Sequence, residues 1–177
     1  MTAFIIEVKD SGVQAALDAL AAKVSNMQPY LHAIGEDIKH RAEARFQTSI
    51  GPDGQRWLPN ARATIEAYIA KQGGFGKKGI NRKGRDLAMN KKPLIGLSQS
   101  LMSQFHVDAT ADQVTVLNSM KYAAIQQFGG LAGKPDKNGK RVSIPARPFL
   151  PIHEDGTLYP EDRAKILDAL NAYLMVR

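Results

Sequence analysis

The sequence predicts an α+β fold, with a small antiparallel sheet packed against a long spine helix and a C-terminal helix. Two periodicities support this class: apolar residues recur at helical spacing in the longer stretches, and they alternate with polar residues in the shorter ones. A third observation is a long basic loop between residues 72 and 92, which carries neither pattern. With 177 residues, the chain fits one domain, residues 1–177.

The N-terminal third predicts a strand followed by two helices. Residues 4–8 alternate between apolar and polar side chains, which is typical of a strand with one buried face. Residues 13–24 place valine and leucine at helical spacing and predict a first helix. Pro29 suits the first turn of a second helix, because its missing N–H needs no partner there. This spine helix is predicted over residues 30–48, and its apolar stripe ends at Phe46.

A turn and an apolar segment follow the spine helix. Residues 51–54 have the glycine, proline and aspartate composition of a turn. Trp57 and the next two residues can then cover the end of the spine helix, so we expect Trp57 and Phe46 to be buried against each other. A third helix is predicted over residues 61–71.

The basic segment carries the whole excess charge of the protein. Residues 71–92 hold eight basic side chains and one acidic one, whereas the net charge of the chain is +7. Without an apolar pattern, residues 72–92 cannot offset their ordering entropy, and we expect this loop to be mobile in isolation. It is either solvated charge or a contact for phosphates or an acidic protein face. The candidate contact residues are Lys77, Lys78, Arg82, Lys83 and Arg85.

The C-terminal half alternates short elements with loops. A short helix is expected within residues 94–102, and an antiparallel hairpin is expected over residues 105–116. Tyr122, Ile125 and Phe128 predict a short helix over residues 121–129, ended by two glycines. The remaining predictions are a second basic loop at 134–140, a short strand at 142–144 and a C-terminal helix over 161–174.

No catalytic or cofactor chemistry is indicated. The chain has no cysteine, which excludes disulfides and thiolate metal sites. Residues 74–79 match G-x-G-x-x-G by letter but follow a helical pattern instead of the strand that a dinucleotide site needs. His32 and His40 lie two helical turns apart, too far to share a metal ion. We therefore expect no enzyme, no metal and no cofactor. Without a signal peptide or a long apolar run, we also expect a soluble protein.

Two motifs resemble a known family. Residues 122–130 and 145–150 are similar to the pair Tyr-Ala-x-x-His-Gln-Phe-Gly and Arg-Pro-Phe-Leu of phage virion-morphogenesis or tail-completion proteins from Mu-like and P2-like tailed phages and prophages. Residues 46–59 and 97–101 resemble two further segments of that family. Two residues depart from its pattern: Gln126 stands in place of histidine, and Gln99 in place of glycine. The alternative is that both motifs are ordinary turns of an unrelated domain.

The resemblance implies a structural role in a phage particle. It implies a tail-completion or neck component that helps join tail to head as a ring, with a hexamer as the expected oligomer. The implied partners are phage tail and head-connector proteins. Non-specific contact of the basic loop with phage DNA is an open alternative to contact with a protein, and no membrane is expected. The implied location is the cytoplasm of the bacterial host during assembly, and retention in the virion is left open. The candidate interface residues are Gln126, Gln127, Arg147 and Phe149, whereas Phe46, Trp57, Tyr122 and Phe128 are expected to be structural.

The sequence is compatible with three alternatives. Arg147 could instead bond the carbonyls that end the helix over residues 121–129. The protein could be a non-specific nucleic-acid-binding module acting through residues 71–92, although a dedicated DNA binder would spread its bases along folded elements. An enzyme would need to assemble its site from unrelated segments of the chain.

Overall fold

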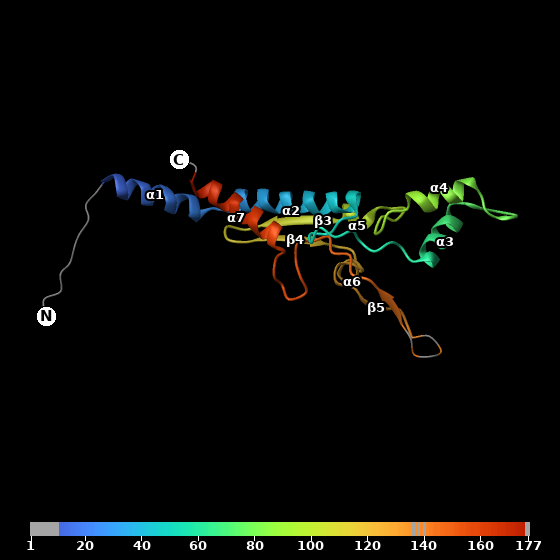
Figure 1. Cartoon of the computed structure of the whole chain (residues 1–177). Coiled ribbons are helices and arrows are strands. Elements are labelled where there is room, and N and C mark those ends of the chain that lie inside the picture. Colours follow the sequence, from blue (N-terminus) through green and yellow to red (C-terminus); the bar gives the residue numbers. More distant parts are fainter. Residues whose placement is uncertain (1–10, 136, 138, 140, 176–177) are drawn as a thin grey trace.

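The computed structural model describes residues 11–135, 137, 139 and 141–175, and shows an elongated molecule built around one long helix (Figure 1). The elements in chain order are α1 (Ser11–Ser25), α2 (Gln28–Thr48), α3 (Arg62–Lys71), β1 (Phe75–Gly76), β2 (Gly79–Ile80), α4 (Arg82–Asn90), α5 (Ser100–Ser103), β3 (Phe105–Ala109), β4 (Val114–Asn118), α6 (Ala123–Phe128), β5 (Gly130–Ala132), β6 (Val142–Ile144) and α7 (Pro160–Met175). The predicted α+β class is confirmed.

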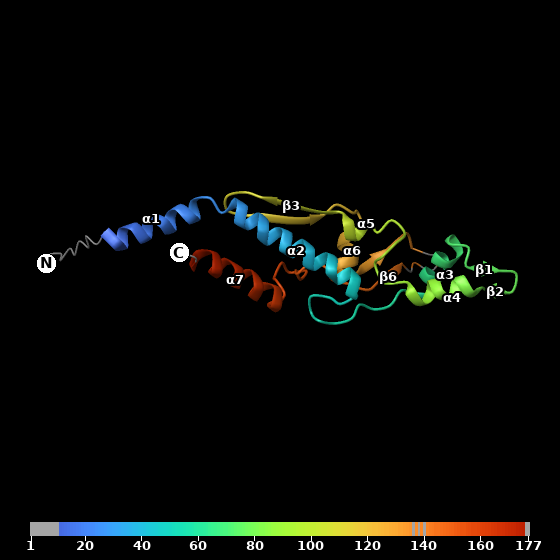
Figure 2. The ribbon, with the colours of Figure 1, turned by 90° about the horizontal axis from the view of Figure 1, so that it is seen from above.

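Helix α2 is the predicted spine helix, and its buried face lies on the β3–β4 hairpin (Figures 1 and 2). The hairpin is antiparallel, with Phe105 opposite Asn118 and Ala109 opposite Val114, so the prediction for residues 105–116 is confirmed. The sheet is nevertheless divided: the described strands form three separate two-stranded sheets, β1–β2, β3–β4 and β5–β6. The predicted strand over residues 4–8 lies outside the described residues.

Aromatic side chains fill the core at the C-terminal end of α2. Phe46 is fully buried, and its ring lies edge-on to that of Trp57 with 5.5 Å between centroids. The expected burial of this pair is thus confirmed. Phe149 is also fully buried, with its ring centroid 5.2 Å from that of Phe46, and Phe105 completes the group. Such tilted and edge-on pairs add to the stabilisation from buried area.

Helix α7, predicted over residues 161–174, packs along α2 through both charge and aromatic contacts. The carboxylate of Asp162 is 2% exposed and bridges two arginines of α2: one oxygen lies 2.7 Å from Arg41, and the other lies 2.6 Å from Arg45. Near the other end of α7, the rings of Tyr30 and Tyr173 stack at 4.1 Å. The two ends of α7 are therefore fixed to α2 by different chemistry.

Residues 72–92 are not one continuous loop, which corrects the expected architecture of this segment. They contain the β1–β2 hairpin and α4, which packs against α3. The side chain of Asn81 caps α4 by accepting the Gly84 N–H at 2.8 Å. A Cβ on Gly84 would lie 2.1 Å from the Gly74 carbonyl oxygen, so only glycine permits this approach. The structure of residues 72–92 depends on helix capping and close backbone contact, and neither produces an apolar pattern in the sequence. The expected mobility of the segment stays a prediction.

The short helix expected within residues 94–102 is reduced to α5, which has four residues. The apolar spacing predicts a longer helix, but the backbone conformation of two residues interrupts it. Leu94 has φ 61° and Gln99 has φ 52°, and a residue in this left-handed region ends or precedes a helix.

Helix α1 agrees with the predicted first helix, yet no residue in it is buried. Leu17, Leu20 and Val24 of its apolar stripe are 44–55% exposed. The reason is that the β3–β4 hairpin ends beside the start of α2, where the Met27 N–H bonds the Ala111 carbonyl, and α1 extends beyond it (Figure 2). Within the described part of the chain, no helix has the length and apolar character needed to cross a membrane.

Candidate functional site

The side chain of Gln127 joins the two C-terminal motifs. Gln127 is 3% exposed, and its Oε1 accepts the backbone N–H groups of Phe149 and Leu150, both at 2.9 Å. Its Nε2 donates to the carbonyls of Leu150 and Ile152, both at 3.0 Å. All four hydrogen-bonding positions of the amide are thus used. Gln127 holds the segment that inserts Phe149 into the core.

Arg147 connects the same region to the segment after the spine helix. It is 6% exposed, and its Nε and Nη2 donate to the carbonyls of Leu58 and Pro59, both at 2.8 Å. Its backbone N–H bonds the Gln126 carbonyl at 2.8 Å. The alternative in which Arg147 bonds the carbonyls that end the helix over residues 121–129 is therefore confirmed for its backbone N–H, whereas its guanidinium bonds residues 58 and 59 instead.

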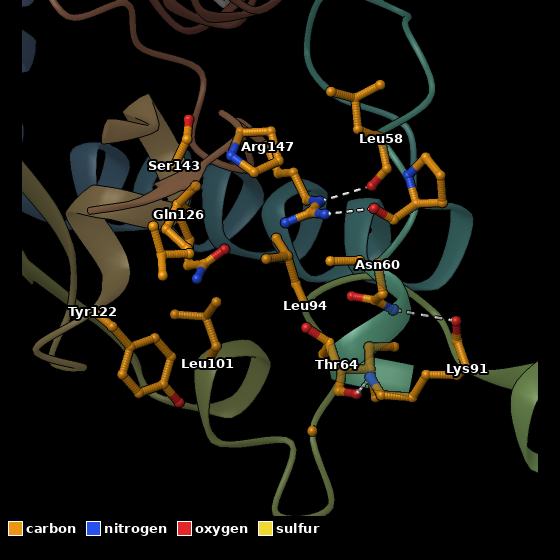
Figure 3. Close-up of a pocket in the computed structure, with 17 residues that line it drawn as sticks. Leu58, Asn60, Thr64, Lys91, Leu94, Leu101, Tyr122, Gln126, Ser143 and Arg147 are labelled. Atoms are coloured by element: carbon orange, nitrogen blue, oxygen red, sulfur yellow. Dashed lines mark hydrogen bonds between the residues drawn. The ribbon is translucent and has the colours of Figure 1, made fainter. Parts of the chain in front are cut away.

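These segments surround one cavity, here called the Arg147 pocket, with a volume of about 590 Å³ (Figure 3). All four segments singled out in the sequence reach it, since Leu58, Leu101, Gln126 and Arg147 contribute to the wall. Most of the remaining wall is apolar, from Pro59, Leu94, Ile95, Val142, Ile144 and Pro145, and its other polar residues are Asn60, Thr64, Lys91, Tyr122 and Ser143.

The pocket is electropositive. Two cations, Arg147 and Lys91, line it, and no residue of the lining is acidic. Burial lowers the pKa of the Lys91 ammonium, and the nearby charge of Arg147 lowers it further. Burial also lowers the pKa of Arg147. Among the described residues no carboxylate pairs with either cation. Both cations donate to backbone carbonyls, and the Lys91 ammonium also lies 5.1 Å from the centre of the Tyr68 ring.

One buried polar atom in this pocket is unpaired. Gln126 Oε1 has no hydrogen-bond partner among the described residues. Its side chain extends across the pocket towards Arg147 (Figure 3). Unsatisfied buried acceptors are rare in folded proteins, and each calls for an explanation. With two cations, one free acceptor and apolar walls, the pocket can bind a small anionic group on an apolar stem. In the described part of the chain no three metal-ligating side chains gather at one point.

The structure distributes the predicted site residues over several environments. Gln127, Arg147 and Phe149 are buried and make internal contacts, and Arg147 also lines the pocket together with Gln126. The role of these four in a subunit interface stays a prediction. Tyr122 and Phe128 are 42% and 39% exposed, so the buried residue of α6 is Gln127 and not the apolar stripe. Sequence reasoning also missed Lys91, whose only signal was its place in the basic segment.

The basic candidates lie at one end of the molecule, away from α1 (Figure 1). Lys77 and Lys78 form the turn between β1 and β2, and Arg82, Lys83 and Arg85 lie on α4. All five are exposed. Lys83 Nζ donates to the Gln72 carbonyl at 2.5 Å, so this side chain already has a partner within residues 72–92.

Comparison with known sequences identifies the chain. Residues 8–175 match the phage virion morphogenesis family, which covers nearly the whole protein. The protein belongs to this family. The resemblance drawn from the motifs is thereby confirmed, and all four segments around the Arg147 pocket lie within the matched range.

A relative of this phage virion morphogenesis protein is the Mu-like prophage FluMu G protein 2 of Haemophilus influenzae. The two are 37% identical over 84 residues, which is 48% of this chain and 53% of the relative. The match therefore spans about half the length of that curated relative. No solved structure matches the chain.

Proposed function

We propose that this phage virion morphogenesis protein is a structural, non-catalytic component of tail completion, which joins the tail to the head as a ring at the neck of the particle. Family membership supports the role in morphogenesis. The observation that carries the proposal further is the amount of surface that one chain leaves exposed. We propose that assembly takes place in the host cytoplasm and that the ring has six subunits.

The accessible surface of the single chain is 12699 Å². A compact monomer of 177 residues would expose roughly 8500 Å². Even the largest allowance for the 15 residues outside the described ranges covers only about 2400 Å² of the difference. The remaining excess, roughly 2000 Å², is similar to the total area that a stable protein interface buries. A chain of this shape gains stability by burying surface against other subunits.

The apolar stripe of α1 is part of that exposed surface. Its apolar spacing alternates between three and four residues and continues unbroken into α2, through Leu17, Leu20, Val24, Met27, Leu31, Ile34 and Ile38. In α2 the hairpin covers this stripe, whereas in α1 it is exposed. A helix of 15 residues is marginal in water without a packing partner. We propose that the neighbouring subunit of the ring supplies that partner.

Electron microscopy of the purified protein, alone and mixed with isolated tails, tests this function. We expect a ring at the head-proximal end of the tails. Leu17→Glu with Leu20→Glu should abolish ring formation without changing the unfolding temperature, because neither side chain is buried. Ala22→Glu, on the opposite face of α1, is the matched control and should assemble normally. Rings formed by the double variant, or tails completed by a monomer, would contradict the proposal.

A second candidate function is non-specific binding of nucleic acid. The exposed cations of the β1–β2 turn and α4 favour it, since clustered bases gain affinity by releasing counterions from phosphates. Replacing Lys77, Lys78, Arg82, Lys83 and Arg85 by serine separates the possibilities. Loss of duplex-DNA retention at low salt with normal tail joining would support DNA contact. Loss of joining with DNA-free components would instead indicate contact with an acidic protein.

A further inference from the structure

The Arg147 pocket combines features that its internal role does not require. Hydrogen bonds from the side chains of Arg147 and Gln127 to backbone groups already hold the surrounding segments together. They do not explain a cavity of about 590 Å³, a second cation at Lys91, or an unpaired acceptor on Gln126.

We propose that the Arg147 pocket binds an extended segment of another polypeptide, one that carries an acidic side chain between apolar ones. The inference rests on the proposed function only in placing that partner within the same particle. The carboxylate lies between Arg147 and Lys91, and the flanking apolar side chains contact the walls.

Charge complementarity selects the acidic residue. Two cations line the pocket without any acid in its wall, and each is buried enough to lose part of its hydration. A carboxylate between them would offset their mutual repulsion and replace lost water contacts. Charge-assisted hydrogen bonds of this kind are roughly twice as strong as neutral ones.

Three further features select a polypeptide over a nucleic-acid phosphate. Gln126 Oε1 is buried without a hydrogen-bond donor; if the side chain turned into the pocket, a backbone N–H of a peptide would supply that donor, whereas a phosphate diester has none. Strand β6 lines the pocket and belongs to a two-stranded sheet, so an extended segment can add to its free edge. The apolar wall from Leu58 and Leu94 to Ile144 fits side chains better than it fits a sugar–phosphate backbone.

The test compares two peptides that differ by one isosteric group, Ac-Thr-Val-Glu-Val-Thr-NH2 and Ac-Thr-Val-Gln-Val-Thr-NH2. Nuclear magnetic resonance titration of the full chain should show saturable shifts of the Gln126 side-chain amide and of Arg147 Nε–H. The glutamate peptide should bind at least ten-fold tighter than the glutamine peptide. Equal affinities, or shifts confined to residues outside the pocket, would overturn the proposal.

Variants assign the binding to the pocket. Gln126→Glu is isosteric, places a negative charge opposite Arg147, and should weaken the glutamate peptide at least ten-fold. Gln113→Glu makes the same change at an exposed position in the β3–β4 loop and should leave binding unchanged. Lys91→Met removes the second cation and should also weaken binding. It replaces Gln126→Glu as the pocket variant if that protein fails to fold. Unaltered affinity in a folded pocket variant contradicts the assignment.

Two further arms separate other occupants and the larger function. A short DNA duplex that displaces the glutamate peptide would assign the site to phosphates and overturn the proposal. If the chain associates with itself and Gln126→Glu abolishes that association, the site belongs to a second copy of the chain. This result would also overturn the proposal. Failure of the wild-type chain to complete tails would count against the proposed function alone, because the peptide titration does not depend on it.

Discussion

The side chain of Gln127 accepts the backbone N–H of Phe149 at 2.9 Å, across 22 positions of sequence. This bond fixes the buried phenyl ring of Phe149 beside Phe46 and closes the core at the end of α2. The motif around residue 127 and the motif around residue 149 are therefore two halves of one contact. Their pairing in the sequence reflects hydrogen bonding inside the subunit.

Gln127→Leu should lower the free energy of unfolding by about 3 kcal/mol, because it leaves buried backbone groups without partners. Gln126→Leu, one position earlier, should cost less than about 1 kcal/mol, since its Oε1 has no partner to lose. Urea unfolding of both variants measures the difference. Equal losses would show that the four bonds of Gln127 contribute little.

Trp57→Ala should destabilise the fold by about 3–5 kcal/mol, as expected for a buried aromatic residue. The indole contacts Phe46, and its Nε1 donates to the Pro148 carbonyl at 3.0 Å. Phe128→Ala is the control and should cost under about 1 kcal/mol, because the ring is partly exposed. Native tryptophan emission should also be blue-shifted; emission like that of the free amino acid would contradict the burial.

Asp162→Asn should cost about 3–5 kcal/mol, because it leaves Arg41 and Arg45 without their shared carboxylate in a buried site. Glu161→Gln, at the preceding position and with a side chain that is 70% exposed, should change the melting temperature little. Thermal unfolding monitored by circular dichroism compares the two. Hydrogen exchange in α7 should also accelerate in Asp162→Asn, and unchanged exchange would mean that the aromatic stack alone holds this helix.

Gln99→Gly should stabilise the protein by about 0.5–1 kcal/mol, because Gln99 adopts φ 52°, where a side chain is strained. Gln104→Gly tests the opposite case: its φ of −102° suits any residue, so glycine there should destabilise by about 0.5–1 kcal/mol. Chemical unfolding of the two variants should give opposite signs. A destabilising Gln99→Gly would mean that its side chain makes a contact worth more than the strain.

Lys91 should make the free energy of unfolding depend on alkaline pH. Its pKa is lowered in the folded protein, whereas the unfolded chain has a pKa of about 10.4. Between these values the unfolded state binds more protons, so stability from this group rises with pH. Lys91→Met should remove that rise, and Lys78→Met in the exposed β1–β2 turn should retain it. Urea midpoints between pH 7.5 and 10 measure the slopes; identical slopes for all three proteins would contradict the prediction.

The raised pKa of Tyr30 acts in the opposite direction but is shared by these variants. Burial favours the neutral phenol, so the unfolded chain ionises first and stability falls as pH rises above about 10. Because this contribution is common to the three proteins, the difference between their slopes isolates the contribution of Lys91.

Sequence periodicity was sufficient wherever an element covers another with an apolar stripe. Helix α2, helix α7 and the β3–β4 hairpin were predicted close to their observed bounds, and the contact between Phe46 and Trp57 followed from one helix end and one turn. Periodicity was insufficient for residues 72–92, where the order comes from the Asn81 cap and the approach of two glycines. Apolar spacing also misplaced the helix over residues 94–99, because such spacing carries no information on the φ angles of Leu94 and Gln99.

The sequence by itself thus determined the α+β class, the spine helix, the family and the concentration of charge in one segment, since each depends on local composition or spacing. Only the tertiary structure decided which residue of α6 is buried. Apolar spacing favoured Tyr122 and Phe128, but Gln127 is buried because its four partners lie more than twenty residues away, at positions 149–152. The Arg147 pocket depends on the tertiary structure for the same reason: its cations, its free acceptor and its walls come from distant segments, and only folding brings them together.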